Sequence, residues 1–413
     1  MRTVPLRRIA RILNGGTPTS AENNWGGDIE WATPVDLART DGRVLGPTDR
    51  KLTEIGLATG STLAPNNAIL LSTRAPIGYT SILATPTSFN QGCKAIVVSS
   101  LGDPRFLQFS LISQKESLQA AGSGSTFLEL SNEALAEAPV FLFPVEDQRR
   151  IADFLDDRVA RIDKIIAARQ QQRLRNEEIL CSLENKLTTI GSGDTRSTCI
   201  EWMPEISSEY EFWRVSRAFS TASGTTPRSD SSMYYGSGTP WITTSDLKDK
   251  IISLIPHSVT DESFRDYSAL KKFPSGTLIV AMYGATVGRL GILESPAATN
   301  QACCAMLPSG PVDVWYAFHW FHAHRSHIMA LASGGGQPNI SQDLVRSLFI
   351  PAPNIKKQKE IVDILSGYQE DLRKADDALI RQIDLLQEYK QSLITAAVTG
   401  EFDVTSASTR IPE

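Results

Sequence analysis

The sequence predicts an α+β protein in which two similar α/β domains are joined by two long antiparallel coiled-coil helices, with an internal repeat about a pseudo-two-fold axis. Two observations support this prediction. Apolar residues recur in alternating steps of three and four over residues 361–396, the heptad pattern of a helix that packs on another helix. The segment also has a counterpart 210 residues earlier, and the resemblance extends into the rest of the chain. This indicates that one structural unit is duplicated.

The C-terminal helix is predicted to start at residue 358 and to extend for about 40 residues, or about 60 Å at 1.5 Å per residue. Its seam is interrupted only by Gln382. The counterpart of Gln382 in the first helix is Gln172, and we expect the two amides to form a buried pair that fixes the register. The expected seam residues are Ile361, Leu365, Tyr368, Leu372, Ala375, Leu379, Gln382, Leu386, Tyr389, Leu393 and Ala396.

The repeat divides the chain into four segments. These are a first globular domain (1–147), a central long helix with its linker (148–195), a second globular domain (196–357) and a C-terminal long helix with a tail (358–413). Apolar runs at 68–72, 95–98, 278–282 and 304–307 predict strands, and residues 104–121 and 314–332 predict helices. From Trp31 onward the offset is expected to stay at 210 residues. Matching positions include Trp31 and Trp241, Gly78 and Gly288, Asn90-Gln91 and Asn300-Gln301, and Ser131 and Ser341.

Composition bounds the class of protein. The chain has 413 residues, a net charge of −5 and five cysteines without paired-ligand spacing, which favours reduced thiols in a cytoplasmic protein. We expect no signal peptide and no membrane span. Residues 358–413 carry 6 basic and 11 acidic side chains, so the globular parts are nearly neutral. Phosphate neutralisation supplies much of the affinity for DNA, so a DNA-binding role would need positive surface from a partner.

Motifs for catalysis are missing from the sequence. We find no phosphate-binding loop, no dinucleotide fingerprint and no Asn-Pro-Pro-Tyr tetrapeptide of an amino-methyltransferase. Glu184 and Lys186 have a nuclease-like spacing but are expected to be an exposed charge pair on a helix. Four histidines suggest a metal site, yet the repeat replaces them with residues unsuited to shared metal binding, so we expect no metal and a partly exposed helix face. They are His319, His322, His324 and His327, opposite Phe109, Ile112, Gln114 and Ser117.

This arrangement resembles the specificity (S) subunit of Type I restriction–modification systems over essentially the whole chain. The most telling segments are 70–78 with Asn90-Gln91-Gly92, then 336–341, and finally 386–400. The resemblance implies that each globular domain is a target-recognition domain for one half of a bipartite sequence in double-stranded DNA, that the helices set the spacer, and that the chain catalyses nothing.

The resemblance also implies partners. Two methyltransferase (M) subunits would carry S-adenosylmethionine, and a motor–nuclease (R) subunit would use ATP and Mg, so that this chain itself binds no cofactor. Two alternatives stay open. One is the specificity subunit of a fused nuclease–methyltransferase (Type IIB-like) system, and the other is a protein-only coiled-coil scaffold that binds no nucleic acid.

Candidate DNA contacts lie where the two copies share a frame but differ in side chains. Residues 72–76 are expected to lie opposite 282–286. Arg74 could read a guanine, and Tyr283 could contact a phosphate or a thymine methyl group; a loop that merely tolerates variation is the alternative. Asn339 and its neighbour Gln337 carry amides suited to adenine. The remaining candidates are Thr17, Thr73, Thr226 and Thr286, with Ser125, Thr126 and Glu129 weaker.

The middle of the first long helix is polar where a coiled coil needs apolar residues. A solvated helix is one interpretation, and a docking surface for a partner, formed by Arg169, Arg173 and Arg175, is the other. If the helices act as a ruler, four residues inserted beside Gln172 add about 6 Å. At 3.4 Å per base pair this lengthens the spacer by about two base pairs.

Overall fold

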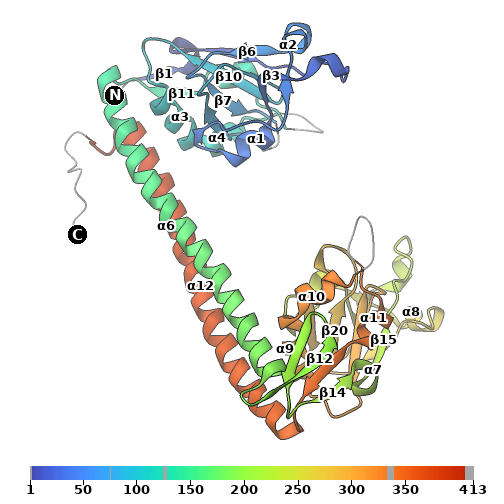
Figure 1. Cartoon of the computed structure of the whole chain (residues 1–413). Coiled ribbons are helices and arrows are strands. Elements are labelled where there is room, and N and C mark those ends of the chain that lie inside the picture. The colour runs from blue at the N-terminus through green and yellow to red at the C-terminus, as the bar shows by residue number, and fades with distance from the viewer. Residues whose placement is uncertain (1, 75, 124–127, 333–338, 405–413) are drawn as a thin grey trace. The chain divides into compact units, whose positions relative to one another are not determined.

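The computed structural model describes residues 2–74, 76–123, 128–332 and 339–404, and the chain forms two compact units. The first contains residues 1–169 and 381–413, and the second contains residues 170–380. Each unit therefore holds one globular α/β domain together with part of each long helix, α6 (Val145–Asn185) and α12 (Ile355–Thr399) (Figure 1). Among the described residues, no helix is long and apolar enough to cross a membrane.

The first unit is built on a five-stranded sheet ordered β2-β10-β7-β8-β4 and a four-stranded sheet ordered β5-β3-β9-β6, with β1 paired to β11. The strands are β1 (Thr3–Pro5), β2 (Ala10–Asn14), β3 (Trp25–Ala32), β4 (Arg43–Val44), β5 (Lys51–Leu52), β6 (Thr62–Ala64), β7 (Ile69–Ser72), β8 (Thr80–Ile82), β9 (Thr87–Phe89), β10 (Cys93–Val98) and β11 (Pro139–Phe141). The α-helices of its domain are α1 (Pro34–Arg39), α2 (Glu54–Gly60), α3 (Pro104–Ser113), α4 (Lys115–Ala120) and α5 (Asn132–Ala136).

The second unit repeats this plan with sheets ordered β15-β23-β20-β21-β17 and β18-β16-β22-β19, and adds the pairs β12-β13 and β14-β24. The strands are β12 (Thr195–Ile200), β13 (Met203–Ser207), β14 (Glu211–Arg214), β15 (Phe219–Ser223), β16 (Tyr235–Ile242), β17 (Lys250–Ile252), β18 (Ser258–Val259), β19 (Lys272–Phe273), β20 (Leu278–Ala281), β21 (Leu290–Leu293), β22 (Ala297–Thr299), β23 (Cys303–Pro308) and β24 (Phe349–Ala352). The α-helices of its domain are α7 (Val215–Ala218), α8 (Asp261–Asp266), α9 (Val314–Ala323), α10 (Arg325–Ala330) and α11 (Gln342–Ser347).

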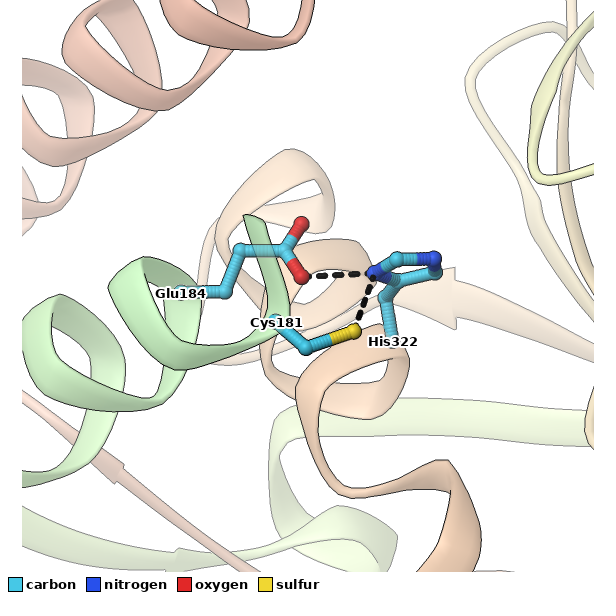
Figure 2. Close-up of side chains that lie close together, drawn as sticks. All are labelled: Cys181, Glu184 and His322. Carbon is cyan, nitrogen blue, oxygen red and sulfur yellow. Dashed lines mark hydrogen bonds and ion pairs between the residues drawn. The ribbon is translucent and has the colours of Figure 1, made fainter. Parts of the chain in front are cut away.

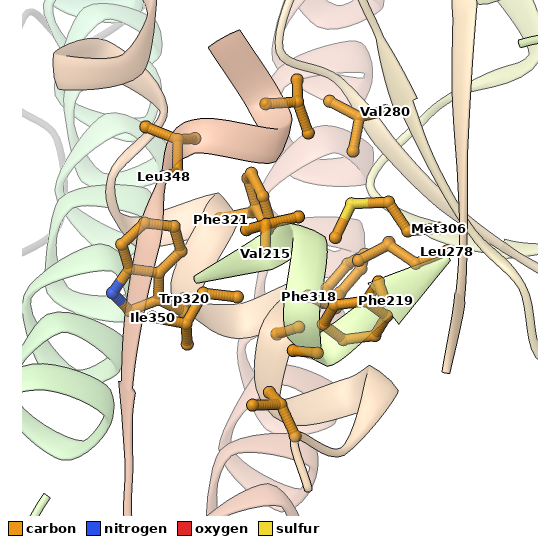
Figure 3. Close-up of a cluster of buried hydrophobic side chains, with 14 of the residues drawn as sticks. Val215, Phe219, Leu278, Val280, Met306, Phe318, Trp320, Phe321, Leu348 and Ile350 are labelled. Carbon is orange, nitrogen blue, oxygen red and sulfur yellow. The ribbon is translucent and has the colours of Figure 1, made fainter. Parts of the chain in front are cut away.

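Both faces of the five-stranded sheet are buried, which explains the continuous apolar strands. In β20, Leu278 and Val280 pack in one core cluster with α9, while Ile279 and Ala281 of the same strand pack in another. The period-two alternation of a strand separates the two sets. Figure 3 shows the first cluster, in which Phe318, Trp320 and Phe321 of α9 lie with Leu278, Val280 and Met306 of the sheet.

A buried glutamine near the start of each long helix ties that helix to its domain. Gln358 is fully buried. Its Oε1 accepts a hydrogen bond from the backbone N–H of Asp313 at 2.7 Å, and its Nε2 donates to the carbonyl oxygens of Pro311 and Pro353 at 2.8 Å each. Asp313 then caps α9. Gln148 makes the equivalent hydrogen bonds in the first unit. The start of each long helix is therefore fixed to the N-terminal cap of a helix in its domain.

The two long helices pack antiparallel in each unit, but the predicted seam was wrong at Tyr368, Ala375, Gln382 and Tyr389, which are exposed. Leu365, Leu372, Leu379 and Leu386 belong to it as predicted. Between them the seam uses Asp376, Ile383 and Lys390, each one residue later than predicted. Tyr389 is 58% exposed, and Gln172 and Gln382 are exposed as well, so neither amide is buried as expected.

Ion pairs explain how polar residues occupy the seam. In the first unit Lys390 Nζ lies 2.8 Å from Asp163 Oδ1, beside the apolar contacts of Ile162, Ile166 and Ile383. In the second unit the guanidinium of Arg173 makes two hydrogen bonds to the carboxylate of Asp376, of which the longer is 3.0 Å. Bidentate pairing of this kind also fixes geometry.

The repeat is confirmed, but its offset does not stay at 210 residues. In the first unit Ile69 of β7 pairs with Ile82 of β8, and in the second Leu278 of β20 pairs with Ile292 of β21. Strands β7 and β20 are therefore 209 residues apart, whereas β8 and β21 are 210 apart. The loop between these strands is one residue longer in the second unit. This difference changes which side chains are equivalent.

Candidate nucleic-acid interface

Three strand ends meet at one edge of the five-stranded sheet in the first unit. Strand β2 ends at Asn14, which pairs with Lys94 of β10, and β7 ends at Ser72, which pairs with Cys93. Because both pairings are antiparallel, the loops that follow β2 and β7 lie beside the loop that precedes β10. In the second unit the ends of β15 and β20 meet the start of β23 through Ser223, Ala281 and Cys303. These two edges carry the candidate residues, and we call each one the strand-end surface.

The same exposed pair marks the strand-end surface in both units. The Thr17 hydroxyl donates a hydrogen bond to the Gln91 side-chain carbonyl, and Thr226 donates to Gln301 in the same way. Gly15 allows this approach, because a Cβ there would lie 2.2 Å from the carbonyl oxygen of Asn90. The sequence predicted Thr17 and Thr226 as contacts but assigned Gln91 and Gln301 to the framework, whereas the structure exposes both glutamines.

The neighbouring asparagines do serve the framework. Asn90 accepts a hydrogen bond from the backbone N–H of Gly92 at 3.0 Å, and Asn300 accepts one from Ala302 at 3.1 Å. Each side chain thereby closes a tight turn before its strand. Shared sequence at adjacent positions therefore reflects two different needs, one for folding the turn and one for presenting an exposed amide.

A short β-bridge carries the side chains that differ between the units. In the first unit Arg74 pairs with Glu129, and Arg74 Nε donates to Glu129 Oε2 at 3.0 Å. In the second unit the bridge joins Tyr283 to Asn339. Because of the 209-residue offset, Arg74 is equivalent to Tyr283 and not to Gly284 as the sequence alignment predicted. Arg74, Tyr283 and Asn339 are exposed and Glu129 is partly buried, so each bridge offers a different chemistry from the same place.

Electrostatics also differ behind the two bridges. Lys94 is largely buried, and its Nζ donates to Asn14 Oδ1 at 3.2 Å. Burial lowers the pKa of Lys94, while Glu129 and Glu133 partly offset that effect. The second unit has the uncharged Cys304 in the equivalent pairing, opposite Ser223. The first strand-end surface therefore has a cation behind it that the second lacks.

The other candidates are placed as follows. The side chain of Thr73 is buried and its hydroxyl donates to the carbonyl oxygen of Gly92 at 3.2 Å, so it does not reach the surface, and this prediction was wrong. Its equivalent, Met282, is also buried. Thr286 is partly buried. Ser125, Thr126 and Gln337 lie outside the described residues.

The three arginines proposed for docking differ in their exposure and partners. Arg173 is engaged by Asp376 within the second unit, Arg169 is partly buried and Arg175 is exposed. The docking role of these arginines stays a prediction. The long helices also expose large apolar side chains, among them Leu174, Ile179, Leu385 and Tyr389.

Two predictions about the second unit were wrong: Glu184 was expected to be part of an exposed charge pair, and the histidines were expected on a partly exposed helix face. Glu184 and His319 are fully buried, and His322 is only 7% exposed. Their carboxylate and rings form hydrogen bonds of 2.8 and 2.6 Å. Burial alone would raise the pKa of Glu184, but the bonds to the two histidines outweigh it and lower that pKa. Burial likewise opposes protonation of His322, but Cys181 and Glu184 raise its pKa to about 10.

A duplicated α/β domain with an exposed, variable strand-end surface, carried on paired long helices, defines a class of paired recognition modules. The family model of the Type I restriction modification DNA specificity domain matches residues 1–175 and again residues 208–382. The chain belongs to this family.

Individual relatives agree with this assignment. The Type I restriction enzyme MjaIX specificity subunit of Methanocaldococcus jannaschii is 32% identical over 43% of this chain, a match that spans only 41% of that subunit. The EcoprrI specificity subunit of Escherichia coli is 23% identical over 88% of this chain and 86% of its own. A solved chain from a study of complex assembly and conformational transition of the type I R-M system has a TM-score of 0.73 at 15% identity, covering 97% of this chain and 98% of the other. That likeness shows the fold.

Proposed function

We propose that this chain is the non-catalytic DNA-recognition subunit of a cytoplasmic Type I restriction–modification complex, and that each unit reads one half of a bipartite target in double-stranded DNA. One observation carries the proposal. The two units present the same strand-end frame, fixed by Asn90 and Asn300, but place different side chains at its exposed bridge. A constant frame with variable exposed polar groups is what direct readout of two different half-sites requires.

The bridge residues suggest how each half-site is read. Arg74 can make bidentate hydrogen bonds to guanine O6 and N7 if DNA binding draws its guanidinium away from Glu129, and Glu129 can accept a hydrogen bond from cytosine N4. In the second unit Asn339 can pair with adenine N6 and N7, and Tyr283 can contact a phosphate or a thymine methyl group. The two half-sites are therefore expected to differ in sequence.

Catalysis and most of the positive surface are assigned to partners. The chain has a net charge of −5, which is poorly suited to neutralising many phosphates alone. In this proposal two methyltransferase (M) subunits bring S-adenosylmethionine and clamp the DNA. A motor–nuclease (R) subunit brings the ATP and Mg chemistry.

We propose the outward faces of the long helices as the docking surfaces for the M subunits. In the first unit Leu385 is 63% exposed and Tyr389 is 58% exposed. In the second unit Leu174 is 55% exposed and Ile179 is 48% exposed. Ile179 and Tyr389 are 210 residues apart, so each unit can offer an equivalent apolar contact to one M subunit. Exposed apolar and aromatic groups of this kind are enriched at protein interfaces.

Co-expression of the chain with its M subunits tests this function. The purified complex is expected to shift a duplex that carries the target and not a scrambled duplex of the same length, and genomic methylation sequencing is expected to return two different half-sites with a fixed gap. Tyr389→Glu and Ile179→Glu should each reduce the number of bound M subunits by one in light scattering, while Arg175→Glu tests the docking role predicted from sequence. Complexes that show no sequence preference would reject the recognition role and leave the protein-only scaffold.

A further inference from the structure

The second unit contains a buried polar cluster, and the first unit has apolar side chains in place of its carboxylate and its two imidazoles. Cys181 and Glu184 lie one turn apart near the end of α6, and His319 and His322 lie one turn apart on α9. Glu184 Oε1 is 2.8 Å from His319 Nδ1, and Glu184 Oε2 is 2.6 Å from His322 Nδ1. The sulfur of Cys181 lies 3.9 Å from the same Nδ1 atom of His322 (Figure 2).

The first unit shows that packing does not require this polarity. At the equivalent positions Phe109, Ile112 and Ile394 form an apolar contact between α3 and α12. Exchanging such a contact for a buried carboxylate and two imidazoles carries a desolvation cost that well-packed apolar side chains avoid. The polar residues therefore need an explanation other than attachment of the helix to the domain.

The geometry points to a metal site. We propose that Cys181, Glu184 and His322 bind one divalent transition-metal ion of the zinc type through Sγ, one carboxylate oxygen and Nδ1. Potential ligand atoms of these three residues all lie within 4.8 Å of one another. Zinc takes thiolate, imidazole and carboxylate ligands at about 2.0–2.3 Å, and tetrahedral geometry at those lengths separates ligand atoms by roughly 3.5 Å. Small side-chain shifts are therefore sufficient.

The surroundings suit such an ion. His319 Nδ1 is placed to donate to the other oxygen of Glu184, the kind of outer contact that orients a metal-binding carboxylate. Cys181 is only partly buried, so the cluster is accessible to solvent from its side. A thiolate and an imidazole favour zinc-like ions over Mg²⁺ or Ca²⁺. Binding would release the thiol proton and the proton shared by His322 and Glu184, so a protonated His322–Glu184 ion pair is the competing state.

Cobalt(II) provides the test, because a cobalt–thiolate bond gives a charge-transfer absorption that hydrogen bonding cannot produce. We expect the full chain, stripped with a chelator, to bind one cobalt(II) per molecule with this band and to lose it when zinc(II) is added. Cys181→Ser should abolish the band. Cys199→Ser, which alters an exposed thiol of the same unit, should leave it unchanged. His319→Gln should weaken cobalt affinity about 10- to 100-fold.

A second variant guards against misfolding. The triple change Glu184→Ile, His319→Phe and His322→Ile copies the apolar contact of the first unit, so it should fold and bind no cobalt(II). The proposal is overturned if the wild-type chain shows no thiolate band, or if Cys181→Ser keeps it. Either result would leave the cluster as an internal ion pair only.

Discussion

Arg74 is held by Glu129 in the free protein, so DNA binding has to exchange that contact for a base. The exposed ion pair contributes little to stability, about 0–1 kcal/mol, whereas a bidentate contact to guanine contributes about 1–3 kcal/mol of discrimination. We therefore expect Arg74→Ala to relax recognition at one half-site, to leave the other half-site unchanged and to spare folding.

The methylated motif of the co-expressed complex measures this effect. Arg7→Ala is the matched control, since Arg7 also pairs with an exposed glutamate, Glu137, of the first unit but precedes β2, at the end opposite Asn14. Equal weakening at both half-sites, or the same change with Arg7→Ala, would contradict a readout role for Arg74.

Gln358 permits a residue-scale prediction about stability. Gln358→Leu leaves the backbone N–H of Asp313, the carbonyl group of Pro311 and the buried carbonyl group of Pro353 without their side-chain partner, which should cost about 3 kcal/mol. For a unit of this size that corresponds to a fall in Tm of about 6–12 °C. Scanning calorimetry of the full chain checks this, with Gln148→Leu expected to act on the first unit and the exposed Gln382→Leu expected to change little.

At the scale of the helix, the sequence predicted α12 correctly but not the face with which it packs on α6. Tyr368, Ala375 and Tyr389 completed an apolar ladder, yet all three are exposed. The true seam includes Asp376 and Lys390, whose charges a periodicity argument assigns to solvent. Their partners lie on the other helix, and no local pattern reveals a pair between residues more than 200 positions apart. The same limit hid the Glu184–histidine cluster.

The corrected seam can be tested directly. Arg173→Leu should destabilise the chain by about 1 kcal/mol because it strips Asp376 of its partner. Adding Asp376→Leu should restore stability or exceed that of the wild type, since paired leucines would extend the apolar seam. Urea unfolding measures both. Ala375→Leu separates the two assignments: a gain in stability would favour the seam predicted from sequence, and no change supports the observed one.

At the scale of the whole molecule, the repeat, the two domains and the paired helices could be predicted, because matching residues recur at a nearly constant spacing along the sequence. The candidate contacts Thr17, Arg74, Thr226, Tyr283 and Asn339 all lie on the strand-end surfaces, and their role in DNA binding stays a prediction. The equivalence of the bridge residues was not accessible. A one-residue difference in loop length is invisible until strand pairing fixes both ends.

The ruler proposal needs a matched change in both helices, because Arg173 pairs with Asp376. Seven residues inserted after Gln172, and seven after Asp376, preserve the heptad phase and add about 10 Å. We expect the methylated motif to keep both half-sites and to gain about three base pairs in its gap. An unchanged gap with full activity would contradict the ruler; the same seven residues placed in the tail after Thr399 are the control.

The extra residue in the second bridge loop falls outside the paired strands, and the strands on either side align one to one. The two loops can therefore be exchanged without changing the pairing of the strands. A chimera that carries the first loop and the Glu129 side of its bridge in both units would pair every flanking strand as before. In such a chain both units would present the same side chains to DNA, and its target would consist of one half-site sequence that occurs twice.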